Sequence, residues 1–194
     1  MEEKFKFHLL QNDVTLCPRT WGMRDECALF YRIYYILGGE AYYADASHEK
    51  ERLKKGSLYI FPVMHSYTMW HNTEDPLYVV WFHAELHVET APELLEIPVV
   101  SGSAMHHLLK TLEAVNGKPE YFSEAEELFR VLLMLIDKEV PFWEIKSRKM
   151  QKVQDFIDEH LEEELTVQRL ADYAGMERSY FSKSFNSIVI FDKR

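Results

Sequence analysis

The chain has 194 residues, 47% of them hydrophobic, and a net charge of −10. This size suits one domain with a substantial core, or one domain and a small second one. No run of 18 apolar residues occurs, so the sequence predicts no membrane-spanning helix. The charged N-terminus lacks an apolar secretory segment, and Cys17 and Cys27 form no disulfide framework or metal motif. A reduced, cytoplasmic protein is the simplest interpretation.

Apolar residues in the first 98 positions predict strands. Alternation of apolar residues predicts a first strand over 4–10. Gly38-Gly39 is expected to join the second and third strands as a tight hairpin, and Lys54-Lys55-Gly56 turns into the fourth. Many short, evenly spaced strands favour an antiparallel sandwich or barrel over a parallel sheet. After the first, the expected strands lie near 29–37, 40–46, 57–61, 65–71 and 77–84.

Four stretches in this region resemble a known type of domain. They are Tyr-Tyr-Ile-Leu-Gly-Gly-Glu-Ala at 34–41, Gly-Ser-Leu-Tyr-Ile-Phe-Pro at 56–62, His-Ser-Tyr at 65–67 and Trp-Phe-His at 81–83. Together they are similar to the cupin-type effector domain of AraC/XylS-type transcription regulators. The resemblance implies a double-stranded β-helix barrel over residues 1–98 that binds a small-molecule effector.

The same strands carry many aromatic side chains with polar groups. A barrel mouth lined in this way can stack on a sugar ring or another small amphiphile and hydrogen-bond its edges. Aromatic side chains that simply fill the core are the alternative. The candidate ligand-binding residues are Tyr34, Tyr42, His65, Tyr67, Trp70, Trp81 and His83.

Histidines raise the question of a metal. His65, His71 and His83 can supply three imidazoles, which is a plausible metal-binding set. However, His65 and His71 are six residues apart on one expected strand, which separates them by roughly 20 Å. The His-x-His pair of metal-binding cupins is also missing between Tyr42 and His48. We therefore predict that these histidines bind no metal and that the protein has no cofactor. A metal-dependent cupin isomerase or dioxygenase is the alternative.

After residue 98 the pattern changes to that of helices. Ser103 is a candidate N-cap for a first helix that ends at Gly117, and Ser123 with Glu126 forms a capping box for a second. The second helix is apolar on nearly all sides, so it is expected to bury two faces. In the family the corresponding helices mediate dimerisation, and packing against the C-terminal helices of the same chain is the alternative. The resemblance assigns a homodimer to segment 99–140, with contacts from Leu128, Leu132 and Leu135.

The stretch from Thr166 to Phe185 has the pattern of a helix-turn-helix. Thr166 is a candidate N-cap, with Leu165 and Leu170 placed as a hydrophobic staple around it. Gly175 stands where a left-handed residue ends the first helix. The apolar stripes of the two helices consist of Val167, Leu170, Ala171 and Ala174, then Phe181 and Phe185.

This stretch, with the helix over 153–161 before it, resembles the first helix-turn-helix of the same regulators. An ordinary helical hairpin is the alternative. The resemblance makes 148–194 a partial DNA-binding domain, because the family has a second such unit and the sequence here ends after the first. The residues expected to contact DNA are Arg178, Ser179, Ser182, Lys183 and Asn186.

The charge distribution predicts weak DNA binding by this chain. Residues 1–147 hold 14 Lys/Arg and 23 Asp/Glu, hence −9, and residues 148–194 hold 8 and 9, hence −1. A near-neutral tail gives little electrostatic attraction to phosphates. The sequence thus predicts an α+β protein and a ligand-responsive, non-enzymatic AraC-type regulator. A shortened regulator that only dimerises and binds effector is a further alternative.

Overall fold

A computed structural model of the chain describes residues 6–46, 49–63, 65–86, 94–140 and 165–174, together with 153, 156, 157, 160, 178, 181 and 182. The chain divides into two compact units. One comprises Met1–Leu86 with Thr90–Val140, and the other His87–Glu89 with Pro141–Arg194. None of the helices in the described part is long and apolar enough to cross a membrane.

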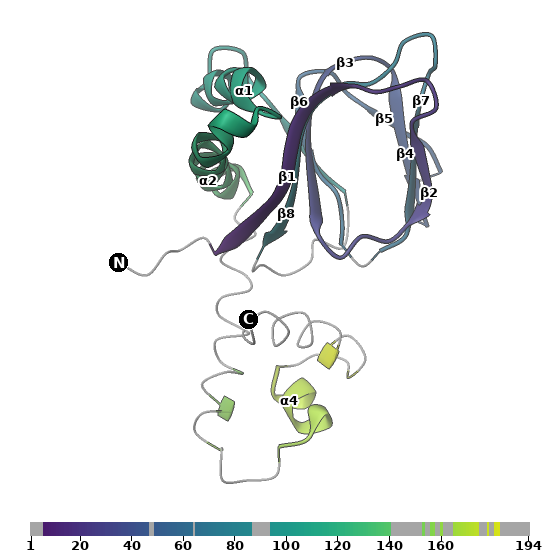
Figure 1. The fold of residues 1–194 in the computed structure, drawn as a ribbon. Helices are drawn as coiled ribbons and strands as arrows, with labels where there is room; N and C mark the ends of the chain where they lie inside the picture. The colour runs from purple at the N-terminus through teal and green to yellow at the C-terminus, as the bar shows by residue number, and fades with distance from the viewer. Residues whose placement is uncertain are drawn as a thin grey trace. The chain divides into compact units, whose positions relative to one another are not determined.

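The first unit is a barrel of two facing antiparallel sheets (Figure 1). One sheet has the order β1-β8-β3-β6-β9 and the other the order β2-β7-β4-β5. The antiparallel barrel expected from the sequence, of the cupin-like type, is therefore confirmed. Its strands are β1 (Phe7–Leu16), β2 (Gly22–Glu26), β3 (Tyr31–Gly38), β4 (Ala41–Asp45), β5 (Glu51–Leu53), β6 (Ser57–Ile60), β7 (Tyr67–His71), β8 (Tyr78–Leu86) and β9 (Leu95–Pro98).

The Gly38-Gly39 turn carries the chain from one sheet to the other. The prediction of a hairpin here is wrong, because β3 pairs with β6 and β8 whereas β4 pairs with β5 and β7. Gly39 has a φ of +87°, and a Cβ at this position would lie 2.1 Å from the carbonyl oxygen of Pro76. The neighbouring amide of Glu40 donates to the carbonyl of Asp75 at 2.9 Å. The turn is thus fixed against the β7–β8 connection instead of a partner strand.

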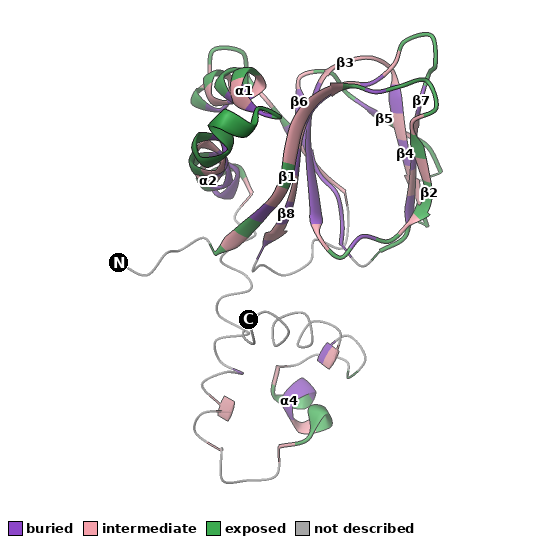
Figure 2. Ribbon diagram, in the orientation of Figure 1, coloured by how far each residue is buried: buried purple, intermediate pink, exposed green. Residues whose placement is uncertain are grey.

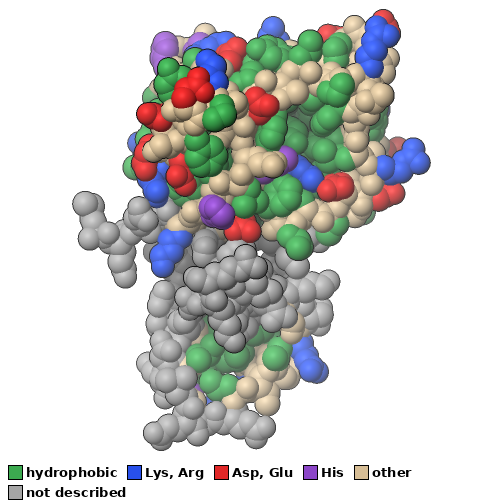
Figure 3. All heavy atoms as spheres, viewed as in Figure 1, with side chains coloured by type: hydrophobic (Ala, Val, Ile, Leu, Met, Phe, Trp, Pro, Cys, Tyr) green, Lys and Arg blue, Asp and Glu red, His purple; other side chains and the backbone are tan. Residues whose placement is uncertain are grey.

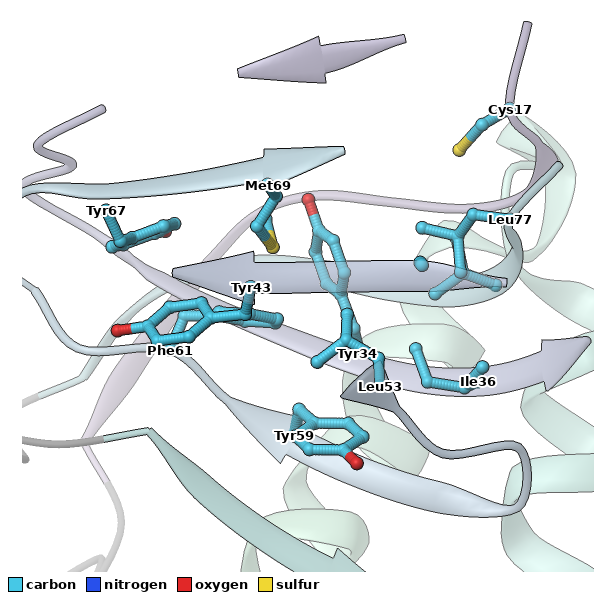
Figure 4. Close-up of a cluster of buried hydrophobic side chains, with 12 residues drawn as sticks. Cys17, Tyr34, Ile36, Tyr43, Leu53, Tyr59, Phe61, Tyr67, Met69 and Leu77 are labelled. Carbon is cyan, nitrogen blue, oxygen red and sulfur yellow. The ribbon is translucent and has the colours of Figure 1, made fainter. Parts of the chain in front are cut away.

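Aromatic side chains fill the interior of the barrel. β3 is buried along most of its length (Figure 2), because one face looks into the barrel and the other is covered by helices. In Figure 4, Tyr67 and Phe61 lie at one end of the interior cluster and Leu77 and Cys17 at the other, with Met69 and Tyr34 between them. The buried members of this cluster are Cys17, Tyr34, Ile36, Ala41, Tyr43, Leu53, Tyr59, Phe61, Tyr67, Met69, Leu77 and Val79.

Helices α1 (Ala104–Val115) and α2 (Phe122–Glu139) lie side by side against the outer face of the sheet that contains β1 and β8 (Figure 1). The predicted cap of α1 is confirmed, since the Ser103 hydroxyl accepts from the His106 amide at 3.1 Å. The predicted capping box of α2 is wrong, because Ser123 lies inside the helix. A 3₁₀ turn, η1 (Pro119–Tyr121), leads directly into α2 and takes the place of a side-chain cap.

Phe129 fixes α2 to the barrel. Its ring lies 5.4 Å from that of Phe7 and 4.8 Å from that of Phe82, which belong to β1 and β8. Leu132 is fully buried within the chain, so the expectation that it contacts a second copy needs correction. The face of α2 that remains exposed carries Val131 and Met134.

The second unit contains a small helical core. Helix α4 (Val167–Ala174) begins as expected, since the Thr166 hydroxyl accepts from the Arg169 amide at 3.2 Å. Gly175 and Phe185 lie outside the described residues. Leu165 of the predicted staple and Ala174 of the predicted stripe pack against the core, whereas Val167 was wrongly assigned to the buried stripe, since it is exposed. The buried members of the core are Val153, Leu170, Ala171 and Phe181.

Candidate ligand-binding site

The structure divides the predicted ligand-binding residues between two faces of the barrel wall. Phe82 contacts α2 on the outside, so its neighbours Trp81 and His83 face the barrel interior. Tyr34 and Tyr67 belong to the interior cluster. These four residues lie on the interior face of the barrel, and their role in ligand binding stays a prediction.

Tyr42, Trp70 and His65 do not face the interior, which corrects the prediction for them. Tyr42 and Trp70 are direct partners in the β4–β7 ladder, and their rings stack at 5.5 Å on the outer face. They alternate with inward residues such as Tyr43 and Met69, and a shift of one position along a strand moves a side chain to the other face. His65 is exposed and precedes β7, with its Nδ1 at 2.9 Å from the carbonyl oxygen of Val63.

Arg32 is the centre of the polar part of the barrel, although it is not among the residues predicted from the sequence. It lies on β3 with 6% of its surface exposed. Its Nη1 donates to the Tyr67 hydroxyl at 2.7 Å and its Nη2 to Oε1 of Glu26 at 2.9 Å. The ring of Phe30 lies 5.2 Å from the guanidinium carbon. An arginine within an otherwise apolar strand was the signal available, because such a residue is rarely buried without a partner.

His83 lies directly opposite Arg32 in the β3–β8 ladder. Its ring is 4.9 Å from Phe30, 4.6 Å from Trp81 and 6.3 Å from Tyr34, with which it stacks. Burial lowers the pKa of His83 to about 4, and the positive charge of Arg32 lowers it further in the same direction. His83 is therefore a neutral imidazole at physiological pH.

Two nitrogens of this group have no hydrogen-bond partner among the described residues: Nε of Arg32 and Nε2 of His83. A buried polar atom without a hydrogen-bond partner lowers the stability of the folded protein, and such atoms in native proteins call for an explanation. The tyrosines beside them are neutral, because burial raises the pKa of both Tyr34 and Tyr67. We call Arg32, Tyr34, Tyr67, Trp81 and His83 the Arg32 cluster. Figure 3 shows hydrophobic side chains gathered between the two sheets, with basic, acidic and histidine side chains beside them.

A second buried polar side chain, that of His71, lies at the other end of β7. Nδ1 of His71 accepts from the Leu77 amide at 3.1 Å, so in the neutral ring the proton is on Nε2. That Nε2 is also without a partner in the described part of the chain. Tyr67 and His71 are four residues apart, which places them roughly 13 Å from each other along the strand. Cys17 at this end is a thiol, because burial raises its pKa to about 11.

Comparison with known proteins identifies the domain. A model of the AraC-like ligand binding domain matches residues 14–133. The chain belongs to this family. No curated protein matches the sequence. The matched range covers the end of β1, strands β2 to β9, α1 and most of α2, and family membership implies a small-molecule effector.

Several solved structures are similar to the AraC-like chain at low identity. ToxT from Vibrio cholerae has 11% identity over 94% of this chain and 75% of that chain, with a TM-score of 0.46. ToxT bound to (E)-4-(8-methylnaphthalen-1-yl)but-3-enoic acid has 11% identity over 93% and 76%, with a TM-score of 0.49. The AraC-like transcriptional activator CuxR has 14% identity over 84% and 63%, with a TM-score of 0.36. The family assignment itself rests on the match over residues 14–133.

The three histidines considered for a metal site do not come together in the AraC-like domain. His83 is on β8 in one sheet, His71 is on β7 in the other, and His65 is exposed before β7. Within the described residues, no three His, Cys, Asp or Glu side chains are close enough to hold a metal ion.

Neutral His83 is expected to make the stability of the AraC-like domain depend on pH. Its pKa is about 4 in the folded chain against 6.5 ordinarily, so the unfolded chain binds the proton first as pH falls. The folding stability associated with neutral His83 is fully present above pH 6.5 and is lost progressively as pH falls toward 4. Urea unfolding at pH 7 and pH 5 should show a larger loss for the natural protein than for His83→Gln. Equal losses in the two proteins would contradict this assignment of the proton.

Proposed function

We propose that this chain is a ligand-responsive transcription regulator, in which a small-molecule effector binds at the Arg32 cluster and alters DNA binding. The observation that carries the proposal is the pair of buried nitrogens, Arg32 Nε and His83 Nε2, that lack partners inside an aromatic barrel. An effector with acceptor groups would satisfy them. Such binding regulates only if the effector has different affinities for two arrangements of the protein.

A sugar or related metabolite is the proposed effector class. The Trp81 ring contacts His83 and donates its Nε1–H to the Thr15 hydroxyl at 3.0 Å, so its orientation is fixed. A fixed aromatic face can stack on the C–H face of a sugar ring. Arg32 and Tyr67 can hydrogen-bond the hydroxyl groups at the edge of that ring.

Thermal unfolding with a panel of sugars, sugar acids and aromatic acids tests the proposal. A compound bound to the native state at 100 times its Kd adds about 2.7 kcal/mol, so the Tm should rise with concentration. Trp81→Leu should reduce that rise, whereas Trp70→Leu on the outer face serves as the matched control and should retain it. A panel without any stabilising compound, or equal rises in both variants, would count against binding at the Arg32 cluster.

We propose that the helical unit contacts DNA through the residues that its resemblance assigns. Arg178 is exposed and Ser182 is half-buried, while Ser179, Lys183 and Asn186 lie outside the described residues. The core of Val153, Leu170, Ala171 and Phe181 supports a helix-turn-helix arrangement. The effector's influence would act through this unit.

DNA binding by the 194-residue chain is expected to be weak and salt-dependent. With a charge of −1 over residues 148–194, the Kd should lie near ~10⁻⁴–10⁻⁶ M at physiological salt. Lys183→Ala should weaken binding further and reduce the salt slope by about 1. Fluorescence anisotropy with labelled duplexes measures both. Nanomolar, sequence-selective binding would contradict the expectation, and no binding at any salt would favour a protein that only binds effector and dimerises.

A homodimer through the exposed face of α2 is the third part of the proposal. Leu128 and Leu135 are half-buried, and Val131 and Met134 beside them are 44% and 46% exposed. Val131→Glu with Met134→Glu should shift the protein toward monomer in light scattering over a concentration series. Thr111→Glu on the exposed side of α1 is the control and should leave the dimer unchanged. A natural protein that stays monomeric at all concentrations would disprove the dimer.

A further inference from the structure

We propose that the Arg32 cluster takes an effector that bears a carboxylate, and that Glu26 occupies the place of this carboxylate when the effector is absent. The inference rests on the proposed function, since it names the chemical class bound at the same site. It goes further in assigning a role to Glu26, an internal acidic side chain that competes with the effector for Arg32.

The hydrogen bonds of the guanidinium leave one edge incompletely used. Nη1 donates to Tyr67, Nη2 donates to Oε1 of Glu26, and Nε has no partner among the described residues. Nε and Nη2 donate side by side in a rigid fork that matches the two oxygens of a carboxylate. Glu26 reaches only one of these two donors. A carboxylate that displaces Glu26 and reaches both donors would form the stronger, bidentate arrangement.

Glu26 is the partner that can be exchanged, because it is less firmly held than Arg32. The Arg32 side chain is 7% exposed, whereas that of Glu26 is 42% exposed. Glu26 ends β2, an edge strand whose pairing with β7 shifts register between Met23 and Glu26. Asp25 beside it has a φ of 51°, an uncommon conformation for a residue with a side chain. The carboxylate of Glu26 therefore belongs to an irregular segment of an edge strand.

A neutral ligand cannot replace Glu26 without loss. A buried charge that loses its partner is destabilised, so the Arg32 guanidinium favours an anion over a neutral group beside it. An incoming carboxylate keeps Arg32 paired, and Glu26 can turn outward because its side chain is already partly in solvent. His83 remains neutral at physiological pH and adds no second positive charge, because its pKa is about 4. The site therefore favours a ligand that carries a single carboxylate.

Aromatic rings around Arg32 define the remainder of the ligand. Phe30 lies over the guanidinium, and the rings of Phe30, Tyr34 and Trp81 surround His83. A flat or apolar ring next to the carboxylate is the ligand group that such aromatic side chains would contact, with the unpartnered Nε2 of His83 available for one polar substituent. Sugar acids and aromatic carboxylic acids share this chemistry.

Matched pairs of probes test the inference by titration calorimetry: D-galacturonate against D-galactose, and benzoate against benzamide. In at least one pair the acid should bind the natural protein at least about tenfold more tightly than its neutral partner. Glu26→Gln should tighten binding of the acid by severalfold and leave the neutral partner unchanged, because the competing charge is gone. Arg32→Lys should reduce the preference, since an ammonium group keeps the charge but cannot form the bidentate pair.

The outcomes separate this inference from the proposed function. Equal affinities within both pairs, or weaker acid binding by Glu26→Gln than by the natural protein, would overturn the carboxylate assignment while leaving a barrel effector in place. Binding by none of the four probes would overturn the inference, and the wider thermal panel would then decide on the proposed function. Glu26→Gln lies at an exposed edge, so its melting curve serves as the check that the protein is folded.

Discussion

Phe129→Ala is expected to lower the free energy of unfolding of the barrel unit by about 3–5 kcal/mol. The ring is fully buried and contacts Phe7 on β1 and Phe82 on β8, at 5.4 and 4.8 Å between ring centroids. Alanine removes both contacts and leaves a cavity, because strands and helix are each held by other interactions and cannot close the gap completely. Urea unfolding followed by circular dichroism measures the loss.

The control for this substitution is Phe122→Ala on the same helix. Phe122 is 45% exposed, and substitutions at such positions usually change stability by less than about 0.5 kcal/mol. A large difference between the two variants is expected only if α2 is packed on the sheet through Phe129. Similar small effects from both would contradict that packing and free α2 for other partners.

Gly39→Ala is expected to prevent folding or to destabilise the barrel by several kcal/mol, on the order of 3 or more. The backbone has a φ of +87°, and the added Cβ would lie 2.1 Å from the Pro76 oxygen and 2.8 Å from Cα of Leu77. Both neighbours are backbone atoms, so neither can rotate away. The Leu77 backbone is also fixed by a hydrogen bond, because the Cys17 amide donates to the Leu77 carbonyl at 2.8 Å.

The adjacent glycine provides a matched control. A Cβ on Gly38 meets no atom within 4 Å, and its φ is not positive. Gly38→Ala should therefore change stability by no more than about 1 kcal/mol in either direction. Thermal unfolding of the two variants measures the contrast. Equal tolerance at both positions would mean that the chain does not cross between the sheets at Gly39.

The strands of the barrel were predictable because apolar and aromatic residues alternate strongly along them. The observed β3, β6 and β8 lie within two residues of the expected ranges at each end. Three strands were missed, and two of them, β2 and β5, are short edge strands rich in charged residues. Edge strands bury little surface, so their sequences need not alternate. The pairing across Gly38-Gly39 was misjudged because two strands joined by a glycine turn can belong to either one sheet or two.

The candidate site was only partly predictable for a related reason. Tyr34, Tyr67, Trp81 and His83 were chosen for their chemistry, but so were Tyr42 and Trp70, which differ from the first group only in strand register. Register is fixed by contacts distant in sequence, such as that of Phe82 with Phe129. Arg32 was overlooked because its two partners, Glu26 and Tyr67, come from other strands, 6 and 35 positions away.

The central claim is that an effector binds inside the barrel at the Arg32 cluster. The indole N–H signals of the four tryptophans report on it directly in ¹H–¹⁵N NMR spectra, once Trp→Phe variants have assigned them. Titration with a compound that raises the Tm should shift the Trp81 signal until it saturates, because its Nε1–H lies on the interior face bonded to Thr15. The Trp70 signal, on the outer face beside Tyr42, should stay in place. A shift of Trp70 with an unchanged Trp81 would place the effector outside the barrel and contradict the claim.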